Sequence, residues 1–169
     1  QKRTMTQNDT TIRIVESFEQ AKGGLPGKWL APARAGAIDS FAAAGFPTPR
    51  SEAWKYTNLN RLARAEFDPH AELKQPDIAD WAHLFIHDCD RIVIVNGRFD
   101  VELSTIGKLP AGVTVSPLSE AVDDIDQNLE KELACIAPDE GAPLVALNTA
   151  FMRDGLVLRL AAGVILDRP

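Results

Sequence analysis

The sequence predicts an α+β protein made of a helical N-terminal cap and a small mixed β/α lobe. In the first third of the chain, apolar residues recur at the spacing of one helix face. From residue 91 the spacing changes to the alternation of β-strands, and Asn96-Gly97 divides two such runs as a hairpin turn would. We therefore expect a flexible N-terminus over residues 1–9, a helical cap over 10–75, a mixed lobe over 76–154 and further strands over 155–169.

Two helices and two shorter helical turns account for the expected cap. Thr10 or Thr11 can cap the first helix, which ends at Gly23-Gly24 and whose apolar stripe contains Ile12, Val15, Phe18 and Ala21. The second helix begins near Pro32 and stops at Gly45, and its stripe contains Ala31, Ala35, Ile38, Phe41 and Ala42. Ser51 can cap a short turn of helix, and Leu59 and Leu62 mark another.

The mixed lobe is expected to alternate strands with short helices. Strands are predicted over residues 84–86, 91–95, 99–103, 113–115, 156–160 and 164–166. An apolar pattern of helical period runs from Leu118 to Ile136, and a break near Asp126 would divide it into two helices. A further short helix is predicted over residues 143–152, and a turn follows at Asp154-Gly155.

Both ends of the sequence indicate a piece of a longer chain. The sequence begins with Gln1, Met5 is a candidate natural start, and the last predicted strand lies three residues before the end. A terminal strand presents unpaired backbone groups that natural sheets normally cover. We therefore expect this chain to be a fragment of a longer protein.

The composition is that of a globular, cytoplasmic protein. The longest apolar stretch, Gly155 to Leu166, is interrupted by Arg159, so no membrane helix is predicted. Lys2 and Arg3 are not followed by the unbroken apolar run of a signal peptide. Cys89 and Cys135 are too few for a disulfide framework, and we expect both thiols to be reduced.

Charge is distributed unevenly along the chain. The formal net charge is 18 minus 24, or −6, which argues against general nucleic-acid binding. Residues 1–64 hold ten basic and five acidic side chains, or +5, whereas residues 65–169 hold eight and nineteen, or −11. Carboxylates between residues 120 and 140 could bind a divalent cation or a basic partner, but their spacing is typical of a solvated helix face.

Basic and aromatic residues alternate near the end of the expected cap. This mixture can bind single-stranded nucleic acid through stacking and charge, and it comprises Arg50, Trp54, Lys55, Tyr56, Arg61 and Arg64. We favour a structural role, because the chain has eleven aromatic residues and needs them for packing.

His83, His87 and Cys89 form the candidate metal site. On a strand these odd-numbered residues would share one face, and imidazole and thiolate ligands suit zinc or iron. No fourth ligand is visible nearby in the sequence, and the spacing matches no common metal motif. We therefore assign no metal ligand and retain a small metal-binding module as an alternative.

Common catalytic motifs are missing from the sequence. It contains no glycine-rich dinucleotide or phosphate loop and no Gly-x-Ser-x-Gly turn, and its three histidines offer little material for a triad. We therefore expect no enzyme, no catalytic residue and no cofactor-binding residue.

Four segments resemble the SufD family of iron-sulfur cluster assembly proteins. The most specific is Phe46-Pro-Thr-Pro-Arg-Ser-Glu-Ala-Trp-Lys-Tyr-Thr-Asn-Leu, which is similar to the family's N-terminal signature. Segments that begin at Ile92, Leu109 and Ala146 follow in the family's order, so the resemblance covers about residues 25–169. Its structural signature is carried by Pro47, Arg50, Glu52, Trp54, Lys55, Tyr56, Thr57, Asn148, Thr149 and Phe151.

This resemblance implies a non-catalytic subunit of the SUF machinery that contacts SufB and the ATPase SufC. It also implies that the helical region leads into a right-handed parallel β-helix, of which residues 155–169 are the first strands and the rest is absent from this chain. The family's cluster-related and SufC-docking residues would lie beyond Pro169, so we expect no cofactor in this fragment. Residues 50–57 would form the hinge of the cap with Trp54 buried, and replacing Trp54 by Ala would then cost about 3 to 5 kcal/mol.

Overall fold

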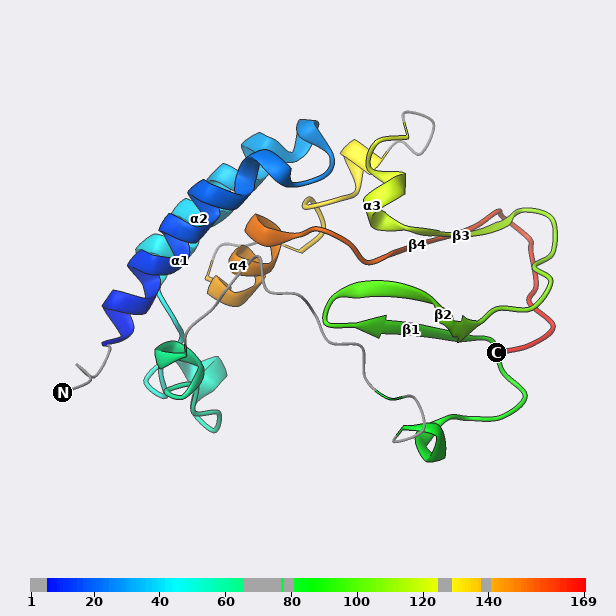
Figure 1. The fold of residues 1–169 in the computed structure, drawn as a ribbon, viewed down its shortest axis with the longest axis horizontal. Helices are drawn as coiled ribbons and strands as arrows, with labels where there is room; N and C mark the ends of the chain where they lie inside the picture. Colours follow the sequence, from blue (N-terminus) through cyan, green and yellow to red (C-terminus); the bar gives the residue numbers. More distant parts are fainter. Residues whose placement is uncertain (1–5, 66–76, 78–80, 125–128, 138–140) are drawn as a thin grey trace. The chain divides into compact units, whose positions relative to one another are not determined.

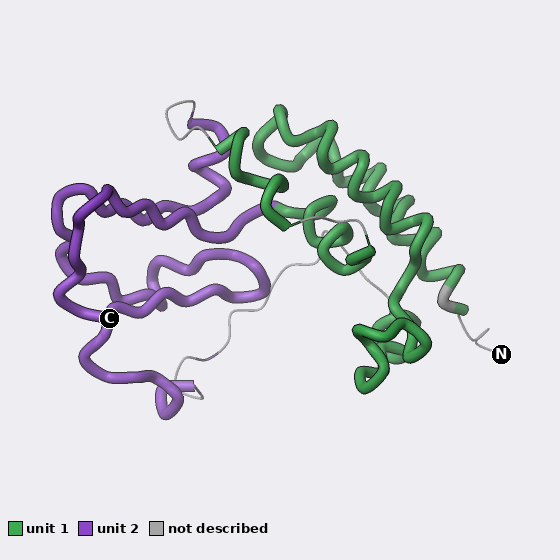
Figure 2. Tube along the Cα trace, turned by 180° about the vertical axis from the view of Figure 1, so that it is seen from behind, with its two compact units in different colours: residues 1–71, 128–152 green, residues 72–127, 153–169 purple. Residues whose placement is uncertain are grey.

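A computed structural model describes residues 6–65, 77, 81–124, 129–137 and 141–169, and it shows an α+β protein (Figure 1). The chain divides into two compact units, and each unit is built from two stretches of the sequence (Figure 2). The first unit contains residues 1–71 and 128–152, and the second contains residues 72–127 and 153–169. Residues 128–152 thus group with the N-terminal helices, whereas the sequence-based division placed them in the mixed lobe.

The described residues of the first unit form three α-helices: α1 (Gln7–Ala21), α2 (Ala31–Ala44) and α4 (Pro143–Phe151). Short 3₁₀ turns join or extend them, namely η1 (Lys22–Gly24), η2 (Lys28–Leu30), η3 (Glu52–Trp54), η4 (Leu62–Arg64) and η8 (Leu129–Lys131). Helix α4 packs against α2, and these helices surround an apolar core to which residues far apart in the sequence contribute.

Helix α1 begins earlier than the sequence predicts, because Thr6 caps it. The Thr6 hydroxyl accepts a hydrogen bond from the Asp9 amide at 3.2 Å, and the Asp9 carboxylate accepts one from the Thr6 amide at 3.0 Å. This reciprocal capping satisfies two amides at the helix start. Thr10 and Thr11, the predicted caps, are instead buried inside the helix, and part of the expected flexible N-terminus is helical; residues 1–5 lie outside the described residues.

The buried faces of α1 and α2 differ from the predicted stripes. In α1, Ile14 and Phe18 are buried while Ile12 is exposed. In α2, which begins beside Pro32 and ends before Gly45 as expected, the buried residues are Arg34, Ala37, Ile38 and Phe41. Ala35 and Ala42 are exposed, because the core lies on the side of the helix that carries Arg34.

Small and aromatic side chains form the core of the first unit. Ala146 and Ala150 on α4 have no exposed surface, which allows α4 to approach α2 closely. Two pairs of rings meet edge to face: Phe41 with Phe46 at 5.3 Å between centroids, and Phe18 with Phe151 at 5.7 Å.

The residues of the second unit that the structure describes include two antiparallel pairs of strands. Strands β1 (Arg91–Val95) and β2 (Arg98–Thr105) form the predicted hairpin, and both turn residues, Asn96 and Gly97, have the positive φ angles of 50° and 81° that a type I′ turn requires. Strand β3 (Val113–Pro117) pairs with β4 (Leu156–Leu160). Helix α3 (Leu118–Ala121) follows β3 directly. In the described part of the chain both sheets are antiparallel, so the parallel β-helix stays a prediction.

Three sequence predictions fail in the described residues because local turns replace regular elements. No strand forms over 84–86. Leu84 instead belongs to the turn η6 (Ala82–Leu84), and the Phe85 amide donates to the Ala82 carbonyl. At 164–166 the chain also turns, since the Val164 amide donates to the Ala161 carbonyl. In the pattern over 118–136, residues 118–124 and 129–136 are described and give α3 and η8 in place of longer helices. Ala134 has a φ of 60° that cannot continue a right-handed helix. The break expected near Asp126 lies outside the described residues.

Candidate functional site

Residues 46–64, which we call the signature segment, are the strongest candidate for a functional surface. Both ends of this segment are anchored in the core of the first unit. Phe46 and Pro47 are buried at one end, and Ala63 is buried at the other. The Ala63 amide also donates to the Leu59 carbonyl at 2.8 Å. The segment is therefore fixed to the helical core although most of it lies on the surface.

A series of hydrogen-bonded turns shapes the middle of the signature segment. The amides of Ser51, Trp54 and Thr57 each donate to the carbonyl three residues earlier, at 2.9 Å in all three cases. The Trp54 bond ends on the Ser51 carbonyl, and the Ser51 side chain makes no capping bond. The expected turn of helix is present, but its predicted hydroxyl cap is wrong.

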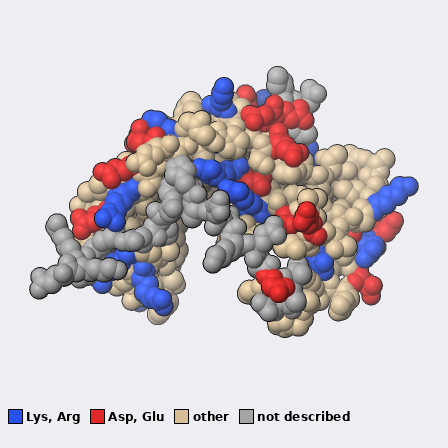
Figure 3. Space-filling view, in the orientation of Figure 1, with Lys and Arg blue, Asp and Glu red and all other residues tan. Residues whose placement is uncertain are grey.

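The turns present basic and aromatic side chains to solvent. Tyr56 is 93% exposed, and the Lys55 ammonium lies 5.5 Å from the centroid of its ring, within the range of a cation–π interaction. Arg50, Glu52, Arg61 and Arg64 are exposed as well. Figure 3 shows Lys and Arg atoms gathered over the part of the first unit that contains this segment.

Trp54 is less buried than the sequence predicts. Its side chain is half-buried, because the turn η3 lies on the surface of the core rather than inside it. Thr57 beside it is exposed. Among the signature residues from Pro47 to Thr57, Pro47 is therefore buried and most of the others are exposed on the surface.

The signature residues Asn148, Thr149 and Phe151 lie on helix α4, and their role is mainly structural. Phe151 contacts Phe18 edge to face, Thr149 is half-buried and Asn148 is exposed. Ala146 and Ala150 belong to the same core as Phe46 and Ala63. The structure thus brings both motifs to one core, although about 100 residues separate them in the sequence.

Arg34 is an important residue that the sequence analysis missed. It is 3% exposed, and its guanidinium donates to the Met152 carbonyl at 2.8 Å and to the Gly27 carbonyl at 3.3 Å. Burial lowers the pKa of Arg34, since desolvation disfavours its charged form. The sequence did contain a signal: position 34 continues the helical spacing of Leu30, Ile38 and Phe41.

Asp154 has a comparable role in the second unit. Its carboxylate accepts hydrogen bonds from the Phe99 amide on β2 and the Ser119 amide on α3, both at 3.0 Å. Burial by itself would raise the pKa of Asp154, but hydrogen bonds from Ser119, Gly155 and Phe99 together outweigh it and lower that pKa. The sequence identified Asp154 only as part of a turn.

The candidate metal residues are not arranged as a site. His83 lies in η6 and His87 in a bend, so the predicted strand that would align them is absent. The Cys89 thiol donates to the Ile86 carbonyl at 3.3 Å. Within the residues that the structure describes, no three His, Cys, Asp or Glu side chains are placed to hold a metal ion.

No helix in the described ranges is both long and apolar enough to cross a membrane.

Comparison with known proteins identifies the family. Residues 25–169 match the family described as the SufBD protein N-terminal region. The whole chain also aligns, at 27% identity over 172 residues, with an iron-sulfur cluster assembly SufBD family protein of Synechocystis sp.. The chain spans 37% of the length of that relative. Because the family match covers most of the sequence, including residues 46–64 and 143–151, this chain belongs to the SufB/SufD family.

Proposed function

We propose that this chain is the N-terminal part of a SufD-like subunit, which works in iron-sulfur cluster assembly through contacts with SufB-like and SufC-like subunits in the cytoplasm. The observation that carries the proposal is the family match over residues 25–169. The printed description of the Synechocystis relative, an iron-sulfur cluster assembly protein, supports the same process.

The assignment to SufD rather than SufB is supported by the signature segment. Its sequence from Phe46 to Leu59 is similar to the SufD signature, and the later motifs follow in SufD order. We further propose that the strands after residue 155 continue into a parallel β-helix in the full-length protein.

A role without catalysis is supported by how the signature residues are used. Pro47 and Phe151 pack in or against the core of the first unit, while Arg50, Lys55 and Tyr56 face solvent. Such side chains are suited to holding a fold and to binding a neighbour. The proposed activity is therefore the assembly of a complex, and the ATPase chemistry would belong to the SufC-like subunit.

Reconstitution tests the proposal directly. Full-length protein would be mixed with SufB-like and SufC-like subunits from the same organism, and the mass of the product measured by size-exclusion chromatography with light scattering. We expect one complex that contains all three polypeptides. Separate elution of the three would contradict the proposal.

A replacement experiment distinguishes SufD from SufB. If the chain is SufD-like, it will complete a complex that already contains the SufB-like subunit, and it will not replace that subunit. Assembly only when the SufB-like subunit is omitted would instead identify the chain as SufB-like.

A further inference from the structure

We infer that the signature segment is a docking surface for an acidic face of a partner protein, with Tyr56 as its anchor. This inference rests on the proposed function, since it assigns a surface to the contacts that the proposed function requires. It follows from the charge, the shape and the exposure of residues 46–64.

The segment carries a clear excess of positive charge. Four basic side chains face solvent against the single carboxylate of Glu52, which gives a local charge of four minus one, or +3; the basic residues are Arg50, Lys55, Arg61 and Arg64. Among the described residues, no ion pair joins any of these four to a carboxylate. A carboxylate-rich surface is the complementary partner for this charge.

Tyr56 gives the surface an anchor of the kind that dominates protein interfaces. It is 93% exposed, so its ring makes little contact with its own chain apart from the Lys55 ammonium above it. Leu62, at 40% exposure, adds apolar area in the next turn of the segment. Tyrosine and arginine are among the residue types that are enriched at binding hot spots, and both are present here.

The surface is organised before a partner binds. The amides of Ser51, Trp54 and Thr57 are held in successive turns, and Phe46 and Ala63 fix the two ends in the core. A segment held in this way loses little conformational entropy on binding, which favours affinity.

An acidic protein fits this surface better than a nucleic acid does. Single strands bind to aromatic rings that are open on their faces and follow one another along a groove. Here Trp54 is half-buried, and Lys55 lies over the Tyr56 ring. The net charge of −6 on the chain also opposes a polyanion, whereas the four basic side chains of this segment suit a compact acidic patch.

Binding measurements on full-length protein test the inference. The probes are the purified SufB-like and SufC-like subunits, and the dissociation constants are measured at low and high salt. Tyr56→Ala should weaken binding to one of them about tenfold or more. The double change Arg61→Glu with Arg64→Glu should weaken binding to the same subunit and make its affinity less dependent on salt.

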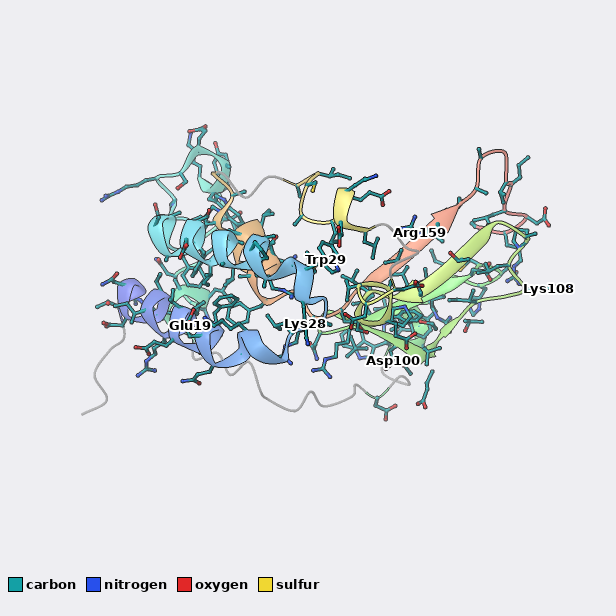
Figure 4. The ribbon with its side chains drawn as sticks, turned by 90° about the horizontal axis from the view of Figure 1, so that it is seen from above. Glu19, Lys28, Trp29, Asp100, Lys108 and Arg159 are labelled. Carbon is teal, nitrogen blue, oxygen red and sulfur yellow. The ribbon has the colours of Figure 1, made fainter. Side chains whose placement is uncertain are left out.

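Two matched variants serve as controls. Ile136→Ala removes an apolar side chain that is 83% exposed, and Lys108→Glu reverses an exposed charge between β2 and β3 in the second unit (Figure 4). Both should bind as the unchanged protein does. Tyr56→Phe keeps the ring and should retain most of the affinity.

The possible failures are distinguishable. If the unchanged protein binds neither subunit, both the proposed function and this inference are overturned. If it binds but the Tyr56 and arginine variants bind equally well, only the docking surface is wrong. Binding of a thymidine oligonucleotide that both variants abolish, with no effect on the protein partners, would reassign the surface to nucleic acid.

Discussion

Arg34 in α2 donates to two backbone carbonyls, that of Met152 at the end of α4 and that of Gly27 at the start of η2. Met152 lies at the C-terminus of α4, where carbonyls carry partial negative charge and a guanidinium is a favourable partner. Because Arg34 is buried, its loss leaves both carbonyls without this donor.

Replacing Arg34 by Met therefore tests a structural role. We expect Arg34→Met to lower the free energy of unfolding by about 2 kcal/mol, the range of a buried hydrogen bond to a charged group. Urea denaturation followed by circular dichroism gives the measurement. Arg61→Met, which changes an exposed arginine, should shift stability by less than about 0.5 kcal/mol. Equal effects from both variants would contradict the role of Arg34.

Asp154 makes the stability of the second unit sensitive to acid. Because its hydrogen bonds lower its pKa below the ordinary value of 3.8, the unfolded state binds more protons as the pH falls through this range. The stabilisation is thus present above about pH 4 and is lost as the pH drops through the lower pKa of the folded state.

The variant Asp154→Asn should remove this part of the acid sensitivity. At neutral pH we expect it to be less stable by about 1 to 3 kcal/mol, since the charged acceptor of the Phe99 and Ser119 amides is lost. Its free energy of unfolding should also fall less than that of the unchanged protein between pH 5 and pH 3, about the range in which such a carboxylate titrates. Asp167→Asn, an exposed change in the same unit, should alter the free energy of unfolding at neutral pH by less than about 0.5 kcal/mol.

Trp54 shows that local sequence does not determine how deeply a side chain is buried. The motif located a turn correctly, but the depth of a side chain depends on which distant elements cover it. Since Trp54 is half-buried, the expected cost of Trp54→Ala falls to about 1 to 2 kcal/mol. A loss above about 3 kcal/mol in a thermal or urea titration would restore the original prediction of a buried ring.

At the scale of elements, strong local signals predicted the structure well. The Asn96-Gly97 hairpin, the helix over 143–152 and the strand over 156–160 are confirmed. The buried faces of the helices were predicted less well. Alanines are distributed around α2, so its sequence does not show which side α4 covers. The buried Arg34 lies on that covered side.

Substitution by alanine at two glycines is expected to change stability in opposite directions. Gly36 lies in α2 with open space where a Cβ would be, so Gly36→Ala should stabilise the protein by about 0.5 to 1 kcal/mol. Gly112 has a φ of 88°, and an added Cβ would lie 3.0 Å from Ala161. Gly112→Ala should destabilise it by more than about 1 kcal/mol. Thermal denaturation of both variants checks the pair, and a stabilising effect at Gly112 would contradict the strained turn.

At the scale of the whole molecule, the sequence predicted an α+β protein but not which segments share a core. No local pattern shows that residues 143–151 complete the N-terminal helices, because that contact depends on the course of the chain between them. The family resemblance, in contrast, was visible from motifs alone, since it depends on residue identity and order rather than on packing.

A shortened polypeptide tests whether α4 is part of the first core. Residues 6–71 alone lack Ala146, Ala150 and Phe151, so the apolar faces of α1 and α2 lose their cover. We expect this polypeptide to be partly helical and to melt without a cooperative transition, whereas the 169-residue chain should show one. A sharp transition at an unchanged temperature would show that α1 and α2 form a core without α4.

The same interleaved order determines when the protein can fold during synthesis. Helices α1 and α2 leave the ribosome before α4, which follows only after the whole stretch 72–127 has been made. Because synthesis proceeds at about 5 to 20 residues per second, the apolar faces of α1 and α2 stay exposed for several seconds. The nascent chain is therefore a natural client for chaperones that bind apolar helices, and slow codons before residue 143 would prolong that exposure.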